Sequence, residues 1–179
     1  MTKQELETCI SEYGRDIYSF CRYLTGNKQE ADDLYQDTFL VAVERCETLD
    51  FTNNPKSYLL SVALRLWKNR KRKFVWRKRI ADVQSVVEEK DMADYESGET
   101  SPEEQVLRKE EGQLVRLAVD RLPERFRLVV LLFYMEELST REIATVMQIP
   151  NGTVLSRLFQ ARKLLRKELE DVLDGEEFR

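Results

Sequence analysis

The side chains best suited to chemistry in this sequence lie on one face of residues 153–169. An α-helix over this segment, at about 100° per residue, groups a hydroxyl, an aromatic ring, an amide and two cations: Ser156, Phe159, Gln160, Lys163 and Lys167. A hydroxyl or amide near a helix N-terminus can hydrogen-bond base edges in a DNA major groove, and cations further along can bind phosphates. The pattern therefore predicts a helix that contacts double-stranded DNA.

An apolar face on the same segment should hold this helix against a core. Its members fall within one narrow sector of the helix: Val154, Leu158, Ala161 and Leu165. Arg157 and Arg162 lie on the flanks between the two faces. An ordinary amphipathic helical hairpin would show the same periodicity, so this segment alone leaves that alternative open.

A shorter helix should precede it, joined by a tight turn. Ser139 can cap that helix, and Glu142 follows at the spacing of a capping box. Its predicted buried stripe consists of Ile143, Ala144 and Met147. We expect Pro150, Asn151 and Gly152 to end the helix and reverse the chain, which would complete a helix–turn–helix.

Charge is strongly segregated along the chain, although the net charge is only −4. Residues 65–80 contain nine Lys and Arg and no acid, whereas residues 81–104 contain nine acids and one cation, Lys90. A basic block beside an acidic block indicates that one segment meets phosphate and the other avoids it. A solvated helix end is the plainer alternative for the basic block.

Three helices are predicted before the acidic block. The first spans about residues 4–24. The second begins after Asn27, which can act as its cap, and runs to about Leu49. The third begins at Pro55, a favoured first residue after an Asn cap, and continues into the basic block.

The second of these helices carries Leu40 in the middle of a polar face. That face is formed by Asp33, Gln36, Asp37 and Glu44. An apolar residue ringed by carboxylates and an amide suits contact with a partner whose surface is basic and apolar. A single exposed leucine is also common, and periodicity alone favours that plainer interpretation.

The remaining pattern predicts an all-α fold of two small helical domains. Residues 82–102 have poor periodicity and many acids, which is typical of a flexible linker. Helical patterning returns at Glu103, with a break before Pro123. Only six Gly and four Pro are present, which is little turn chemistry for a β-rich fold. We therefore expect an acidic flexible linker between the domains, and the helix–turn–helix in the C-terminal one.

Composition narrows the function classes. Histidine is absent, and Cys9, Cys21 and Cys46 lack metal-site spacing, so we expect neither His-based catalysis nor a metal or other cofactor. No apolar run approaches the length of a membrane span, and the N-terminus lacks the apolar region of a signal peptide. The cysteines suit reduced core residues, and we expect a cytoplasmic protein.

Several segments, in order along the chain, share the pattern of a known family. They are ADDLYQDTFLVA (31–42), NPKSYLLSVALRLWKNRKRK (54–73), SPEEQVLRKEE (101–111) and the run over 121–167 that begins RLPERFR. Together they resemble bacterial RNA polymerase sigma factors of the small extracytoplasmic-function class. The first is similar to that family's core-polymerase-binding helix and the second to its −10 reading helix. The last two resemble its −35 reading domain.

The resemblance implies a division of labour along the chain. Residues 1–81 would bind core RNA polymerase and the −10 element, residues 82–102 would be the linker, and residues 103–179 would bind the −35 element. The protein would have no enzymatic activity of its own but would direct promoter-specific transcription initiation. Its implied partners are core RNA polymerase, promoter DNA and an anti-sigma factor, and no membrane insertion is expected.

The resemblance also assigns candidate contact residues. Those for core polymerase are Asp33, Gln36, Asp37 and Leu40. Those for the −10 element are Phe51, Asn53, Asn54, Arg65, Lys68, Asn69 and Arg72. Those for the −35 element are Thr153, Leu155, Ser156, Arg157, Phe159, Gln160, Arg162, Lys163 and Lys167. For the two adjacent asparagines, loop and helix-cap chemistry is the alternative to base recognition.

The chain departs from the family pattern at three of these positions. Basic residues are common where it has Leu155 and Gln160, and Asn is frequent where it has Arg65. Promoter preference is therefore not transferable from relatives, and Leu155 offers a thymine-methyl contact instead of a phosphate or guanine contact.

Two other function classes stay open from sequence. One is a stand-alone helix–turn–helix regulator, which would usually dimerise to match two half-sites. The other is a metal-dependent enzyme that uses the carboxylates of the second helix: Asp32, Asp33, Asp37 and Glu44. The polymerase-contact helix and the two-domain layout argue against the regulator. The absence of histidine, and the position of Asp32 on a different face from Asp37, argue against the enzyme.

Overall fold

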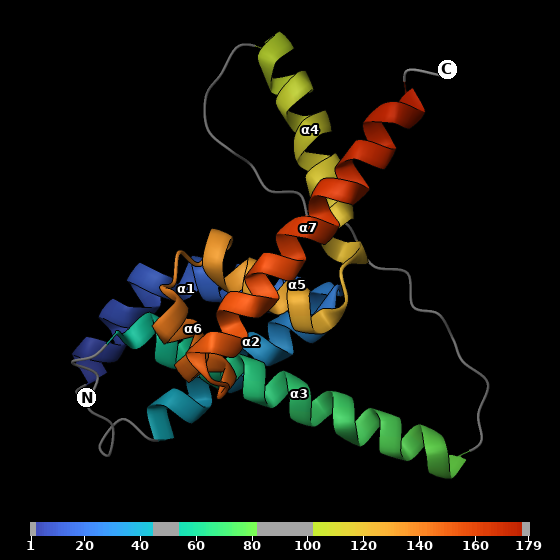
Figure 1. Ribbon diagram of the computed structural model, residues 1–179. Coiled ribbons are helices and arrows are strands. Elements are labelled where there is room, and N and C mark those ends of the chain that lie inside the picture. The colour runs from blue at the N-terminus through green and yellow to red at the C-terminus, as the bar shows by residue number, and fades with distance from the viewer. Residues whose placement is uncertain (1–2, 45–53, 82–101, 177–179) are drawn as a thin grey trace. The chain divides into compact units, whose positions relative to one another are not determined.

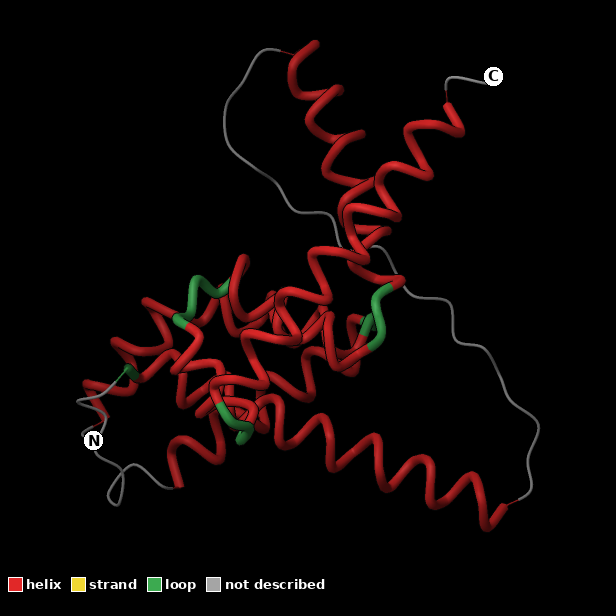
Figure 2. The backbone as a smooth tube through the Cα atoms, viewed as in Figure 1, coloured by secondary structure: helices red, strands yellow, loops and turns green. Residues whose placement is uncertain are grey.

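The computed structural model describes residues 3–44, 54–81 and 102–176, with side chains over 7–44, 54–77 and 112–170. Every regular element in these ranges is a helix (Figure 1, Figure 2). The chain divides into two compact units, Met1–Asp94 and Tyr95–Arg179. The predicted all-α fold of two helical units is therefore confirmed, while the domain boundaries at residues 81 and 103 stay predictions. Residues 82–101 of the predicted linker lie outside the described residues, as do Cys46, Phe51 and Asn53, whereas Pro102, the last residue of the predicted linker, begins α4.

The first unit is a bundle of three helices that each pack against the other two. These helices are α1 (Lys3–Thr25), α2 (Lys28–Glu44) and α3 (Pro55–Ala81). The largest fully buried side chains of the bundle are Ile17, Phe20, Leu34, Leu59, Leu60 and Leu64. The C-terminal part of α3 extends away from α1 and α2 (Figure 1), and residues 71–77 are all exposed. The bundle thus presents a free helical end that carries much of the basic block.

The turn between α1 and α2 follows from its sequence. Gly26 takes the left-handed conformation (φ 69°), which ends α1 at a residue that has no Cβ to clash. Asn27 Oδ1 then accepts hydrogen bonds from the backbone N–H groups of Gln29 and Glu30, at 2.8 and 3.3 Å. The predicted cap of the second helix is confirmed.

The second unit is built around its last helix. Its elements are α4 (Pro102–Arg121), α5 (Glu124–Val130), the π-helical turn η1 (Leu131–Met135), α6 (Thr140–Met147) and α7 (Asn151–Glu176). α7 packs against α4, α5 and α6. The predicted break before Pro123 is confirmed, and Pro123 is the N-cap residue of α5, with φ −52° and ψ 138°. η1 was not predicted, because π-helical turns are rare and appear mostly as single turns inside α-helices.

α6 and α7 form the predicted helix–turn–helix. The capping box at the start of α6 is present: Ser139 Oγ accepts the Glu142 N–H at 3.3 Å, and the Glu142 carboxylate accepts the Ser139 N–H at 2.7 Å. Ile143 and Met147 are buried as predicted. Val146 is also buried and was absent from the predicted stripe, whereas Ala144 is half-buried.

The turn between α6 and α7 lies earlier than predicted. Gln148 takes the left-handed conformation (φ 55°), and the Ile149 N–H donates to the Ala144 carbonyl at 3.0 Å, which completes a Schellman motif. The Pro150 carbonyl then accepts the first backbone hydrogen bonds of α7. The prediction that residues 151 and 152 reverse the chain is wrong, because both belong to the first turn of α7.

Candidate functional site

Leu40 lies on an exposed face of α2, as the sequence predicts. Its side chain is 59% exposed, and Asp33 and Gln36 on the same face are exposed as well. Val43, which lies one turn further along α2, is 45% exposed and widens the apolar spot. Sequence reasoning missed Val43, although its spacing of three residues from Leu40 was a readable signal.

A cationic side chain from α3, that of Arg70, covers part of this polar face of α2. Arg70 Nη2 lies 2.5 Å from Asp37 Oδ2 and donates a hydrogen bond to the Asp33 carbonyl oxygen at 3.2 Å. Asp37 is therefore half-buried and paired within the unit, while Asp33 presents its carboxylate to solvent. Arg70 was not among the predicted contact residues, and it is the residue that ties the α2 face to α3.

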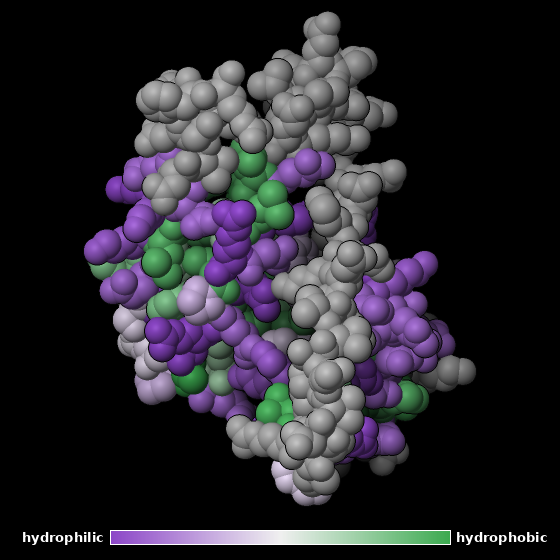
Figure 3. Space-filling view, turned by 90° about the vertical axis from the view of Figure 1, so that its right-hand side faces the viewer, coloured by the Kyte–Doolittle hydropathy of each residue, from purple (hydrophilic) through white to green (hydrophobic). Residues whose placement is uncertain are grey.

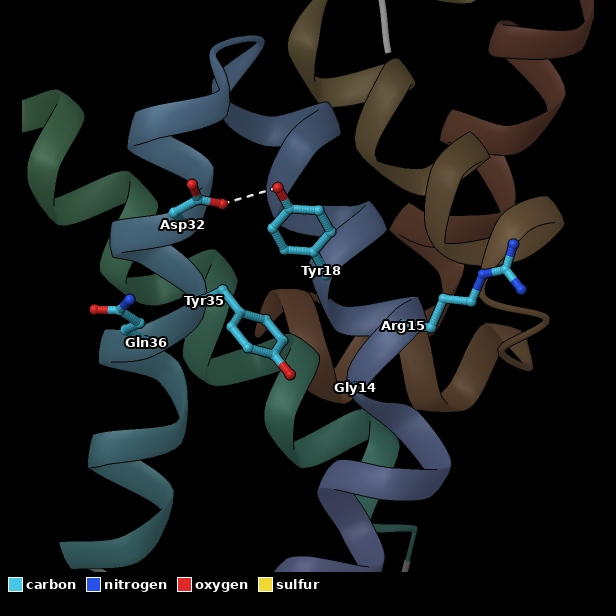
Figure 4. A pocket seen from close by; sticks show the side chains of 6 residues that line it. All are labelled: Gly14, Arg15, Tyr18, Asp32, Tyr35 and Gln36. Atoms are coloured by element: carbon cyan, nitrogen blue, oxygen red, sulfur yellow. Dashed lines mark hydrogen bonds between the residues drawn. The ribbon is translucent and has the colours of Figure 1, made fainter. Parts of the chain in front are cut away.

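An open cavity of about 470 Å³ lies beside this face, between α1 and α2. It is lined by Gly14, Arg15, Tyr18, Asp32, Tyr35 and Gln36 (Figure 4). In the figure, Arg15 points away from the other labelled side chains. A Cβ on Gly14 would lie 2.9 Å from the Tyr35 hydroxyl oxygen, so glycine leaves room for the end of the Tyr35 side chain against α1.

The Asp32 carboxylate on the wall of this cavity accepts a hydrogen bond from the Tyr18 hydroxyl at 2.8 Å (Figure 4). This bond, together with burial and the negative charge of Asp32, raises the pKa of Tyr18 above its ordinary value of 10.0. Asp32 is thus held by an α1 tyrosine on a different face from Asp37. Among the described residues, no three His, Cys, Asp or Glu side chains are grouped so that they could hold a metal ion.

The predicted −10 contacts on α3 form a stripe that leaves the bundle. Arg65 and Arg72 are exposed, and Lys68 and Asn69 are half-buried. Arg72 Nη2 donates a hydrogen bond to Asn69 Oδ1, so these two side chains lie side by side on the helix surface. The structure therefore brings the cations of this set onto one accessible surface.

Asn54 has a structural role at the start of α3. Its Oδ1 accepts the Ser57 N–H at 3.1 Å, and its backbone is left-handed (φ 69°). The predicted Asn cap before Pro55 is confirmed. The cap chemistry that was the alternative for Asn54 is thus present, and Phe51 and Asn53 lie outside the described residues.

The face of α7 that was predicted to contact DNA points to solvent along its length. Its exposed members are Leu155, Ser156, Phe159, Gln160, Arg162, Lys163 and Lys167, while Thr153 and Arg157 are half-buried. Phe159 is 67% exposed and Leu155 52% exposed. Green apolar side chains also appear among purple polar ones elsewhere on the molecule, on the one face drawn in Figure 3. The opposite face is buried as predicted at Val154, Leu158 and Ala161.

Arg162 is oriented by an aromatic pair in η1. Its Nε donates to the Tyr134 hydroxyl oxygen at 2.8 Å, and its guanidinium lies 5.6 and 5.8 Å from the ring centres of Phe133 and Tyr134. These contacts fix a cation at the edge of the outward face of α7. Sequence reasoning missed Tyr134, because only the tertiary fold brings η1 beside α7.

Two family models match the chain at the positions of these surfaces. Sigma-70 region 2 matches residues 9–77, which include the exposed faces of α2 and α3. Sigma-70, region 4 matches residues 112–165, which include the helix–turn–helix. The two matches follow one another in the order of the two units.

Relatives of known role match over nearly the full length. The chain is 29% identical to the ECF RNA polymerase sigma factor SigW of Bacillus subtilis over 167 residues, which cover 91% of this chain and 88% of that protein. It is 30% identical to the RNA polymerase sigma-H factor of Pseudomonas aeruginosa over 177 residues, which cover 96% of this chain and 89% of that protein.

The fold is also similar to that of a solved sigma factor. The sigma factor RpoE of Bartonella quintana, crystallised with the anti-sigma factor NepR, superposes with a TM-score of 0.76 at 19% identity. The match covers 93% of this chain and 98% of that one. No helix in the described part of this chain has the length and apolar character needed to cross a membrane.

Proposed function

The chain belongs to the sigma-70 family of bacterial RNA polymerase sigma factors, in the extracytoplasmic-function class, and from this premise we propose which residues perform each step of promoter recognition. The protein binds core RNA polymerase and directs transcription initiation at promoters through their −10 and −35 elements. Sigma factors are transcription initiation factors rather than enzymes. The predicted contact residues acquire specific roles on this basis.

The α2 face is the contact for core polymerase. Leu40 and Val43 form the apolar centre, and Asp33 and Gln36 form a polar rim, which is the usual composition of a protein interface. Asp37 contributes from a fixed position, because Arg70 holds its carboxylate. The partner surface should therefore be apolar at its centre and basic around it.

The N-terminal unit also binds the −10 element, through α3 and the loop before it. Arg65, Lys68 and Arg72 supply phosphate contacts, with Asn69 beside Arg72. Phe51 and Asn53 receive a flipped base, since capture of an extruded base suits strand opening. Asn54 positions this loop by capping α3 and has at most a secondary contact with the base.

The outward face of α7 reads the −35 element in the major groove. Ser156 and Gln160 contact base edges, and Leu155 and Phe159 make apolar contacts. Lys163 and Lys167 bind phosphate further along the helix. Arg157 and Thr153 lie at the side of the face. Arg162, which donates a hydrogen bond to the Tyr134 hydroxyl, contacts the DNA backbone.

The domain limits follow the same division. Residues 1–81 form the polymerase and −10 binding domain, residues 82–102 the linker, and residues 103–179 the −35 binding domain. The solved relative from B. quintana was crystallised with an anti-sigma factor, which supports a similar inhibitor for this chain. The protein has no enzymatic activity of its own and works in the cytoplasm, where it meets polymerase and DNA.

The observation that carries this proposal is the pair of exposed faces that one chain presents. One is acidic with an apolar centre, on α2, and the other is polar, aromatic and basic, on α7. Reconstitution with bacterial core polymerase and mapping of transcript start sites on a genomic library tests it. Transcripts should start at shared sequence elements only when both proteins are present. Specific binding of a dimer to DNA without polymerase, and no initiation with it, would identify a stand-alone regulator instead.

A further inference from the structure

An exposed arginine in the second unit is held in position by two aromatic side chains of η1. Arg162 on α7 donates a hydrogen bond from Nε to the Tyr134 hydroxyl oxygen at 2.8 Å. Its guanidinium lies 5.6 Å from the ring centre of Phe133 and 5.8 Å from that of Tyr134. The two rings in turn pack edge to face, with their centres 5.0 Å apart. Because a surface arginine usually samples many rotamers, these contacts order the Arg162 side chain before a ligand binds.

The charge of this ordered arginine is not neutralised by its own unit. Among the residues that the structure describes, no carboxylate forms an ion pair with Arg162. Arg121 of the same unit, by contrast, lies 2.5 Å from a carboxylate oxygen of Glu168. An ordered cation that lacks an anionic partner is suited to bind an anion from outside the chain.

The hydrogen bond between Arg162 and Tyr134 leaves donors available on both side chains. It uses only the N–H on Nε of Arg162, so the N–H groups on both Nη atoms remain. Tyr134 accepts in this bond, so its own O–H can still donate, and the residue is 54% exposed. The pair thus offers the fork of a guanidinium beside a hydroxyl donor. This combination matches the several oxygens of a phosphate group.

The position of Arg162 on α7 indicates where that phosphate lies. At about 100° per residue, Arg162 falls within about 20° of Leu155, on one flank of the outward face, and Arg157 lies on the opposite flank. A helix with its side chains is about 10–12 Å across and the major groove is about 12 Å wide, so the flanks of a bound helix meet the sugar–phosphate walls. A helix that reads bases through Ser156 and Gln160 therefore carries Arg162 to the strand on the Leu155 side.

We propose that Arg162 and Tyr134 form a phosphate clamp on the −35 duplex, in which both Nη groups of Arg162 and the Tyr134 hydroxyl bind oxygens of one backbone phosphate. This rests on the proposed function, which places α7 in the major groove. Tyr134 thereby becomes a DNA-contacting residue outside the helix–turn–helix, and it also positions Arg162. Phosphate contacts carry no base information, so the clamp fixes where α7 sits in the groove while Gln160 reads the sequence.

The first test locates the phosphate. Polymerase holoenzyme is titrated with a promoter found by start-site mapping, in which single phosphates around the −35 element are replaced in turn by neutral methylphosphonates. At one phosphate the replacement should weaken wild-type binding by about tenfold, because it removes the anion that the clamp binds. The same replacement should leave binding by Arg162→Ala nearly unchanged, since that contact is already lost. With Tyr134→Phe it should weaken binding by only about threefold.

Salt dependence separates the roles of the two side chains. Arg162→Ala removes a charge and should reduce the slope of log affinity against log salt by roughly one unit. Tyr134→Phe removes no charge, so it should lower affinity by about threefold at an unchanged slope. Arg162→Lys should keep the slope but lose the bond from Nε. Addition of Tyr134→Phe to Arg162→Lys should therefore cost less affinity than it costs in the wild-type chain.

Arg125→Ala is the matched control. Arg125 is also an exposed arginine beside an aromatic ring, 4.7 Å from the ring centre of Phe126, but it lies on α5 and not on the outward face of α7. Its variant should keep the wild-type pattern of methylphosphonate effects. Thermal unfolding of every variant is measured alongside. If Tyr134 only stabilised the fold, Tyr134→Phe would unfold at a lower temperature and lose affinity without changing the effect of any single phosphate.

Several results would overturn the clamp. One is the same methylphosphonate pattern for wild type and Arg162→Ala, and another is a Tyr134→Phe pattern equal to that of wild type. Unchanged DNA patterns together with weaker competition by polyglutamate against Arg162→Ala would assign this arginine to an acidic protein partner instead. Failure of the wild-type chain to support initiation would refute the proposed function. A wild-type chain that initiates, with both variants matching it at every phosphate, refutes the clamp alone.

Discussion

The Asp37 carboxylate on α2 forms a salt bridge with Arg70 on α3, at 2.5 Å. A residue assigned to polymerase contact therefore also links two helices of its own unit. Exposed pairs of this kind contribute about 0–1 kcal/mol to stability, so the link is weak but directional. Removal of Asp37 would change both the proposed polymerase interface and the position of the Arg70 side chain. Substitution of Leu40 therefore tests the α2 face more directly.

Leu40→Ala should weaken association with core polymerase by about 2 kcal/mol, since a central apolar anchor is lost. Its side chain is exposed, so helical content and thermal stability should not change. Titration of labelled protein with core polymerase measures the affinity. Ile10→Ala is the matched control, because Ile10 is an exposed aliphatic side chain on α1. Equal affinities for the Leu40 variant and wild type would remove this face from the interface.

Asn54→Ala should lower the free energy of unfolding by about 1 kcal/mol, because α3 loses its N-cap. Asn54→Asp should retain most of that stability, since Asp caps helices equally well and tolerates the left-handed backbone. Thermal unfolding of both variants measures the difference. Permanganate footprinting of open complexes with Asn54→Asp then separates the two roles. Normal melting of promoter DNA by this variant would restrict Asn54 to the cap.

Replacement of Lys68 and Arg72 by alanine should weaken promoter capture and flatten its salt dependence. Each lost phosphate contact should reduce the slope of log affinity against log salt by roughly one unit. Lys28→Ala removes an exposed cation from the start of α2 and controls for net charge alone. Binding isotherms at several salt concentrations measure the slopes. Parallel lines for the double variant and wild type would place these side chains away from phosphate.

Gln160→Ala should cost about 1–3 kcal/mol at one base position of the −35 element and relax the preference there. Lys163→Ala should instead weaken binding to all sequences alike, because phosphate contacts carry no sequence information. Leu155→Arg should raise general DNA affinity and shift one preferred base. Selection by holoenzyme from a promoter library randomised over the −35 element measures the base preference of all three variants. A preference changed by Lys163→Ala but not by Gln160→Ala would mean that α7 sits rotated in the groove.

Gln148→Gly should stabilise the second unit by up to about 1 kcal/mol. Gln148 holds the left-handed position of the Schellman motif at the end of α6, where a Cβ is unfavourable. Gln160→Gly, at an exposed site inside α7, should instead destabilise by about the same amount. Chemical unfolding of the two variants measures both signs. A loss of stability at position 148 would show that the Gln side chain makes a contact worth more than the strain.

Local signals in the sequence were sufficient for much of the fold. Helix N-caps depend on residues only three or four positions apart, and three predicted caps are present in the structure. They are Ser139 with Glu142, Asn27, and Asn54 before Pro55. The outward face of α7 followed from periodicity because a helix fixes which side chains share a side. The turn at Gln148 escaped notice, since Gln carries none of the sequence signal that Gly or Asn gives at such positions.

Contacts between distant segments were beyond the reach of periodicity. Arg70 meets Asp37 across 33 residues, and Tyr134 meets Arg162 across 28. Each pairing depends on where two helices cross, which no local pattern encodes. Leu40 was found because an apolar residue stood out against a polar face. The half-burial of Asp37 was not predicted. Helical periodicity places Asp37 on the polar face of α2 but does not show that α3 brings Arg70 against it.

The C-terminal part of α3 extends from the bundle as one continuous helix, so it can only move as a unit with the part that packs on α2. Trp76 lies six residues past Arg70, about 9 Å along the axis, and the helix is continuous between them. A tilt of about 10° about the Arg70–Asp37 contact would therefore carry the indole sideways by about 1.5 Å. Asp37 lies on the α2 face that we assign to polymerase. A small rotation of α3 about this contact therefore produces a larger displacement at the C-terminal end of α3 than at Arg70. On the proposed assignment of the α2 face, docking on polymerase would set the direction of the exposed end of α3 without a hinge between the two helices.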